Sequence, residues 1–122
     1  MKTFFLPLFA VFFFCQASLA EPELCGKWKM EDFGSVIEIF RQNDMFYGKI
    51  TKVSDNDKKH KVGQMLLTDI VYVASLNKYK GQVNAANNIT ADGELEFINE
   101  NKLQLTVKRL FLKKIKTFFR IE

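Results

Sequence analysis

The sequence predicts an all-β protein, a small antiparallel meander of about eight short strands that closes into a barrel or half-barrel. Apolar and polar residues alternate along much of the chain, and this period of two is typical of strands. No long segment repeats its apolar residues at the helical period of about 3.6. Residues typical of turns separate the apolar runs at short intervals. Closure removes the exposed edges of such a sheet, so a barrel is favoured over a flat arrangement.

The predicted strands begin where apolar and β-branched residues gather and end where turn residues follow. In chain order they cover residues 35–40, 45–53, 65–76, 79–85, 94–97, 103–107 and 115–121, and an earlier strand opens near Gly26. The polar segment 54–63 is the longest expected loop. Segment 64–76 could instead form a helix, but its β-branched residues favour a strand. Lys113 and Lys114 mark the expected turn before the last strand.

The first 20 residues have the order of a secretory signal peptide: an early lysine, an apolar run, and small residues before the expected cut. The apolar run is shorter than the roughly 20 residues that span a membrane as a helix. We therefore expect a cleaved signal peptide over residues 1–20 and a single barrel-like domain over residues 21–122, without a transmembrane span. The expected location is periplasmic or secreted.

Cleavage would change the charge and the cysteine content of the chain. It would remove Lys2 and leave 17 of the 18 basic residues against 14 acidic ones. Six of the 13 phenylalanines would also leave, so seven would remain to build a core. Cys25 would be the one remaining cysteine, and an internal disulfide is therefore not expected in the mature chain.

The motif Gly26-x-Trp28 predicts how one end of the barrel closes. A tryptophan early in the first strand can plug a barrel beneath a cation from the last strand, and Arg120 is placed for this if the two strands are neighbours. A guanidinium over an indole face contributes about 0.5–2 kcal/mol. The alternative is that Trp28 is an ordinary core residue or lies half-exposed near an edge. We expect Gly26, Trp28 and Arg120 to have a structural role in this closure.

The chain contains Gly26-x-Trp28, Ser-Val-Ile-Glu-Ile at 35–39, Tyr-Gly-Lys-Ile at 47–50 and a terminal Arg120. Together these motifs resemble an exported bacterial family that is defined by a domain of unknown function. The resemblance covers the mature chain and implies a small, exported, barrel-like domain with no established activity. The glycine–tryptophan motif and the terminal arginine are also similar to those of lipocalin-type barrels, which carry apolar small molecules. This second resemblance implies a lipocalin-like fold.

The second hairpin departs from the pattern of the exported family. Relatives of that family carry two cysteines across this hairpin, where this chain has Gln42 and Tyr47. The disulfide that the resemblance would allow is therefore absent, and the hairpin must be held by packing and strand pairing.

Few residues suggest catalysis. His60, the single histidine, lies among lysines in a polar loop, where a histidine is usually solvated. Cys25 has no histidine near it in the sequence, which argues against a thiol nucleophile. Glu94 and Glu96 point to one face of a strand and could act as an acid–base pair, but such residues more often form the solvated face of a sheet. We therefore predict no catalytic residue and a protein that is not an enzyme.

Neither a metal site nor a cofactor site is predicted. A single histidine and no cysteine pair cannot supply the ligand set of a typical transition-metal site. Asp55 and Asp57 resemble the start of a calcium loop, but the glycine and the closing glutamate at the required offsets are missing. No glycine-rich loop is present to hold a phosphate group.

The first predicted function is a binding module that holds a small apolar or lipid-like ligand inside the barrel. A barrel of about eight strands is either just filled by side chains or able to hold one small ligand. The expected interior contacts are Trp28, Phe40, Phe46 and Phe97.

The alternative is a module with a filled core that acts through its basic C-terminal hairpin. The basic residues of this hairpin are Lys108, Arg109, Lys113, Lys114 and Lys116. They could bind an anionic lipid, another anionic envelope component or a protein partner. Lysines of this kind can also protect a sheet edge from pairing with further strands. Nucleic acid is not expected because the chain is exported, and the sequence does not specify an oligomeric state.

Overall fold

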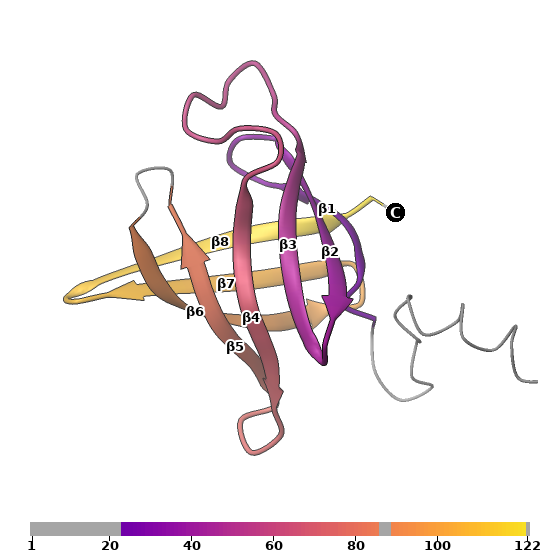
Figure 1. Cartoon of the computed structure of the whole chain (residues 1–122), viewed down its shortest axis with the longest axis vertical. Coiled ribbons are helices and arrows are strands. Elements are labelled where there is room, and N and C mark those ends of the chain that lie inside the picture. The colour runs from indigo at the N-terminus through magenta and orange to yellow at the C-terminus, as the bar shows by residue number, and fades with distance from the viewer. Residues whose placement is uncertain (1–22, 86–88, 122) are drawn as a thin grey trace, which may run out of the picture.

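The structure, a computed structural model, describes residues 23–85 and 89–121. Within these ranges it contains eight β-strands and no helix, and it confirms the predicted all-β barrel. The strands form one closed antiparallel barrel in chain order, with β8 paired to β1 (Figure 1). The predicted signal peptide lies outside the described residues. The strands are β1 (Gly26–Met30), β2 (Val36–Gln42), β3 (Met45–Lys52), β4 (Met65–Val73), β5 (Lys78–Asn84), β6 (Thr90–Asn99), β7 (Lys102–Arg109) and β8 (Leu112–Arg120).

Each strand pairs with the next one along the chain, and residues that suit tight turns join several of them. Asn43 and Asp44 connect β2 to β3 with positive φ angles of 55° and 68°, a conformation that these residue types tolerate better than most. Asn77 has a positive φ of 55° just before β5. Segment 65–73 forms strand β4, so the helical alternative for this part of the chain was wrong.

The turn between β7 and β8 lies earlier in the chain than predicted. Leu110 and Phe111 form this turn, whereas Lys113 and Lys114 belong to β8 and pair with residues of β7. The prediction was wrong because it placed the turn at the two most polar residues. The paired register of β7 and β8 instead continues through both lysines until Arg109 lies opposite Leu112.

Three glycines allow neighbouring strands to approach closely inside the barrel. A Cβ atom on Gly48 would lie 3.0 Å from the Leu67 side chain, and one on Gly93 would lie 2.6 Å from Val83. On Gly81 it would lie 2.4 Å from Ile70 Cδ1 and 2.8 Å from the carbonyl oxygen of Asp69. Side chains from adjacent strands therefore occupy the space above these glycines.

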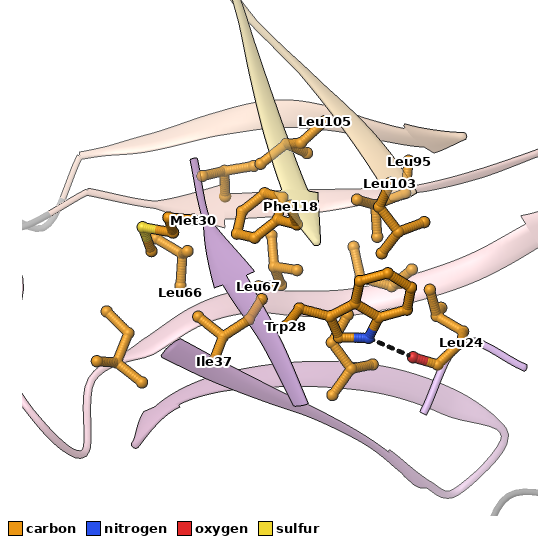
Figure 2. Close-up of a cluster of buried hydrophobic side chains, with 14 residues drawn as sticks. Leu24, Trp28, Met30, Ile37, Leu66, Leu67, Leu95, Leu103, Leu105 and Phe118 are labelled. Carbon is orange, nitrogen blue, oxygen red and sulfur yellow. Dashed lines mark hydrogen bonds between the residues drawn. The ribbon is translucent and has the colours of Figure 1, made fainter. Parts of the chain in front are cut away.

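Fully buried side chains fill the centre of the barrel. Trp28 and Phe118 are the largest of them, come from the neighbouring strands β1 and β8, and are both 0% exposed. Figure 2 shows Phe118 near Met30 and Trp28 near Leu24, with aliphatic side chains of other strands around them. All eight strands contribute to this packed apolar core. Its members are Leu24, Trp28, Met30, Ile37, Ile39, Ile50, Leu66, Leu67, Ile70, Val83, Leu95, Leu103, Leu105 and Phe118.

Candidate functional site

The structure brings Trp28 and Arg120 together at the end of the barrel where β1 begins and β8 ends. The two residues are paired across β1 and β8, and the guanidinium carbon of Arg120 lies 4.2 Å from the centre of the Trp28 ring. The indole Nε1 of Trp28 donates a hydrogen bond of 3.0 Å to the carbonyl oxygen of Leu24 (Figure 2). Gly26 lies in the same strand, two residues before Trp28. These contacts cover this end of the barrel at the junction of β1 and β8.

The guanidinium of Arg120 also ties separate parts of the chain to this end. It donates hydrogen bonds of 3.2 Å to the carbonyl oxygens of Cys25 and Glu100, and a third to the carbonyl oxygen of Glu23. Burial lowers the pKa of Arg120, while the carboxylates of Glu23 and Glu100 act in the opposite direction. The arrangement is structural, because every donor of Arg120 in these contacts is satisfied by main-chain carbonyl groups.

Three of the four predicted interior residues contact the core, and Phe40 does not. Trp28 is fully buried, and Phe46 and Phe97 pack partly buried against the core. Phe40 instead stacks on Tyr47 of β3, with ring centres 5.8 Å apart. Because Ile39 points inward, the next residue in the strand must point outward. The prediction of an interior Phe40 was therefore wrong.

Two tyrosines that the sequence analysis missed complete a set of aromatic rings at one end of the barrel. The ring of Tyr79 lies 5.6 Å from Phe46, 5.1 Å from Tyr72 and 6.4 Å from Phe97, measured between ring centres. Phe97 in turn lies 6.0 Å from Trp28. We call Phe46, Tyr72, Tyr79 and Phe97 the aromatic row. Val83 faces inward, and alternation along β5 places Tyr79 on the same face. This pattern could have identified Tyr79 from the sequence.

The aromatic row is only partly covered. Tyr72 is 41% exposed, and the other three members are half-buried. All four lie close to the turns at residues 43–44, 74–77 and 100–101. The side chain of Arg41 stands beside them, with its guanidinium carbon 6.0 Å from the centre of the Phe46 ring and one nitrogen 3.2 Å from Asp44 Oδ1. The end of the barrel therefore presents aromatic surface and one exposed cation.

A buried polar cluster lies at the other end of the barrel and includes the single histidine. The Asp57 carboxylate accepts a 2.7 Å hydrogen bond from Ser35 Oγ, lies 2.7 Å from His60 Nδ1, and accepts bonds from the main-chain N–H groups of Lys59 and His60. Burial alone would raise the pKa of Asp57, but the hydrogen bonds from Ser35, Lys59 and His60 hold it well below its usual range. The prediction that His60 is a solvated loop residue was therefore wrong. Its side chain is 11% exposed and is paired with Asp57.

This cluster does not have the arrangement of a catalytic triad. The carboxylate of Asp57 lies between Ser35 and His60, whereas a triad places the histidine between the nucleophile and the carboxylate. Ser35 and Asp57 are 22 residues apart in the sequence, so their contact could not be read from spacing. The cluster fastens the 53–64 loop to the start of β2.

Glu94 is surrounded by lysines on the outer face of the barrel. Its carboxylate oxygens lie 3.5 Å from Lys108, 3.6 Å from Lys78 and 3.8 Å from Lys80. Burial raises the pKa of Glu94, but these lysines have the larger combined effect and lower it. Glu94 is therefore an ionised carboxylate, and it borders an open polar pocket of about 550 Å³ on this face. Glu96 takes part in none of these ion pairs within the described part of the chain.

The predicted basic residues of the last hairpin separate into two groups. Lys108 contacts Glu94, and Lys116 forms an ion pair of 2.6 Å with Asp32 and lies over the Phe33 ring. Arg109, Lys113 and Lys114 are exposed at the tip of the hairpin, beside Leu110, Phe111 and Leu112. The apolar residues of this turn are a feature that the sequence analysis did not recognise.

The described residues show neither a group of metal ligands nor a helix that could cross a membrane. Within residues 23–85 and 89–121, no group of three or more histidine, cysteine or acidic side chains is arranged to hold a metal ion. Cys25 is disulfide-bonded in the structure. No helix suited in length and hydropathy to crossing a membrane occurs in the described ranges.

Comparison with known proteins supports the fold. No protein-family model and no curated protein matches the chain. Among solved structures, the chain is similar to HP1028, a protein of the human pathogen Helicobacter pylori that belongs to the lipocalin family. The TM-score is 0.67 at 20% sequence identity, and the match covers 84% of this chain and 85% of HP1028. The lipocalin-like fold of the prediction is confirmed, and the resemblance to an exported family of unknown function stays a prediction.

Proposed function

We propose that this chain is an exported, non-catalytic, lipocalin-like module that binds a small apolar ligand at the aromatic row. The observation that carries the proposal is the partial exposure of four neighbouring aromatic side chains at one end of the barrel. Aromatic surface of this kind gains free energy when an apolar group covers it. The lipocalin-like fold supports a ligand at a barrel end.

The packed core restricts where the ligand binds. Large apolar side chains of all eight strands meet in the centre, and neighbouring side chains occupy the space above Gly48, Gly81 and Gly93. A ligand would therefore lie against the rings of the aromatic row at the end of the barrel and would not reach Phe118. This limits the apolar part of the ligand to a single ring system or a short acyl chain.

Arg41 supports a preference for ligands that also carry an anionic group. Its side chain is 48% exposed and stands beside Phe46 at the rim. Its partner, Asp44, is 93% exposed, and such a surface ion pair is weak enough to exchange for a ligand carboxylate. A short fatty acid or an aromatic acid would match both the rings and the cation.

Export and the absence of catalysis belong to the same proposal. The order of residues 1–20 supports export through a cleaved signal peptide to the periplasm or the cell exterior. The pairing of His60 with Asp57 supports a structural role for the single histidine.

The first prediction is that short-chain fatty acids or a fluorescent naphthalene sulfonate bind saturably and change the fluorescence of Trp28. Replacing Tyr79 with leucine or Tyr72 with alanine should weaken this binding roughly tenfold, because a ring contact contributes about 0.5–1.5 kcal/mol beyond the area it buries. The measurement is a fluorescence titration, with thermal unfolding of each variant recorded in parallel.

Phe40→Ala is the matched control for this experiment. Phe40 is also an aromatic residue of the barrel wall, but it lies on the outer face, so its removal should leave ligand affinity unchanged. The proposal fails if the unaltered chain shows no saturable binding, or if Phe40→Ala weakens binding as much as the two tyrosine variants.

A further inference from the structure

The turn of the β7–β8 hairpin exposes three consecutive apolar residues. Leu110 is 88% exposed, Phe111 is 100% exposed and Leu112 is 70% exposed. Figure 1 shows this turn standing clear of the other strands at the far left. The pairing explains why it projects, since β1 reaches only Phe118–Arg120 of β8 and β6 reaches only as far as Lys108 of β7. Three adjacent exposed apolar side chains on a projecting turn suggest that another apolar phase covers them.

The backbone at this turn is not relaxed. Leu110 has a φ of 55°, in the left-handed region that favours glycine, asparagine and aspartate. The other residues with positive φ in the described ranges are asparagines, aspartates and glycines. Residues that break a local rule without any packing gain are expected where a protein has a functional surface. The leucine here contributes little to the stability of the hairpin, which points to a role outside it.

The β7–β8 hairpin itself carries charge of a single sign, although Glu94 of β6 lies 3.5 Å from Lys108. Residues 101–121 contain seven lysines and arginines and no aspartate or glutamate. Lys108 lies directly opposite Lys113 in the register of the hairpin, and like charges placed opposite each other destabilise a strand pair. Arg109, Lys113 and Lys114 form no ion pair within the described residues. An external anionic surface would offset this repulsion.

Protection of a sheet edge accounts for only part of this pattern. The first half of β8 is not paired with β1, so Lys113 and Lys114 could prevent further strands from adding there. This role does not require Leu110, Phe111 and Leu112 at the turn, and exposed apolar residues would work against it.

We infer that the β7–β8 hairpin docks on anionic lipid bilayers. The side chains of Leu110, Phe111 and Leu112 enter the boundary between headgroups and acyl chains, and Arg109, Lys113 and Lys114 contact lipid phosphates. Apolar side chains at the centre with cations around them match the layered chemistry of such a surface. Each cation near an anionic bilayer strengthens binding roughly fivefold. This inference rests on the hairpin alone and does not depend on ligand binding at the aromatic row.

The test is co-flotation of the full chain with lipid vesicles. Vesicles of phosphatidylcholine with about 25% phosphatidylglycerol should retain the protein at low salt, and retention should fall as salt screens the lysines. Pure phosphatidylcholine vesicles should retain at least about tenfold less. The double variant L110N/F111S should lose at least about tenfold in binding, and it should fold normally because the replaced side chains are almost fully exposed. K113E/K114E should lose the preference for anionic lipid.

Two control variants complete the design. K58E/K61E makes the same charge change in the exposed 53–64 loop, and V62S/I98S removes two exposed apolar side chains elsewhere. Both should bind vesicles as the unaltered chain does. Equal losses in the controls, or equal binding to both kinds of vesicle, would overturn the inference. A third result would also overturn it: the unaltered chain forms a dimer and does not bind vesicles, and L110N/F111S is a monomer. The tip would then contact a second copy of the chain.

Discussion

Arg120 stabilises the barrel at the point where the sheet closes on itself. Its guanidinium covers the buried Trp28 ring and donates to main-chain carbonyl groups that come from the N-terminal segment and from the β6–β7 turn. A single side chain therefore connects the first strand, the last strand and a turn between them. Few other residue types could do this, because the contacts require a flat cation with several donors.

We predict that Arg120→Ala lowers the free energy of unfolding by about 2–4 kcal/mol, the combined effect of a lost cation–π contact and lost charged hydrogen bonds. The stability of Arg120→Lys should lie between that of Arg120→Ala and that of the unaltered chain, because lysine keeps the charge and loses the planar set of donors. Urea unfolding followed by Trp28 fluorescence measures both. Arg109→Ala, in the exposed hairpin tip, should change stability by less than about 0.5 kcal/mol. Equal stability of Arg120→Ala and the unaltered chain would show that the closure does not need the arginine.

At the scale of elements, the 53–64 loop is held by one buried carboxylate. Asp57 accepts hydrogen bonds from Ser35 at the start of β2 and from two main-chain N–H groups of its own loop. Next to it, Phe33 lies between Lys59 and Lys116, 5.7 Å and 5.2 Å from the ring centre. The loop, the β1–β2 connection and β8 are therefore joined at the end of the barrel opposite Trp28.

The lowered pKa of Asp57 gives this loop a defined response to pH. A carboxylate whose pKa is lower in the folded chain stabilises the fold above its ordinary pKa of 3.8, and the contribution is lost as pH falls below that value toward the folded pKa. Asp57→Asn should therefore cost about 1–3 kcal/mol at pH 7, and the difference from the unaltered chain should shrink between about pH 5 and pH 2. Unfolding curves collected across this range measure the effect.

Asp55→Asn serves as the control for that series, because Asp55 is an exposed residue of the same loop. It should leave both the stability and its pH dependence unchanged. A constant difference between Asp57→Asn and the unaltered chain at all pH values would contradict the assigned role of the carboxylate.

At the scale of the whole molecule, alternation and turn residues were enough to predict a closed barrel, and the pairing of Trp28 with Arg120 followed from placing the first and last strands side by side. Other contacts depended on information that lies outside local sequence. Phe40 was placed inside because it is large and apolar, whereas the strand register turns it outward. The inward position of Tyr72 requires the bulge between Thr68 and Val71, and the Ser35–Asp57 contact joins segments that only the folded barrel brings together.

The last prediction concerns the glycines that allow the barrel wall to close. Replacement by alanine should be tolerated in the order Gly48, Gly93, Gly81. The new Cβ would meet a flexible leucine side chain at Gly48, the branched Val83 at Gly93, and both Ile70 and a main-chain oxygen at Gly81. Overpacking of this kind costs about 1–3 kcal/mol, and more where the backbone must move.

Thermal and urea unfolding of the three alanine variants measure this order, and a rescue variant identifies its cause. Val83→Ala removes the Cγ2 atom that would lie 2.6 Å from a new Cβ on Gly93, so Gly93→Ala should cost less in a Val83→Ala background than alone. No main-chain contact is relieved by changing Ile70, so Ile70→Val should restore Gly81→Ala only in part. If all three alanine variants were equally stable, the space above the glycines would be open, and a ligand could then reach deeper into the barrel than the aromatic row.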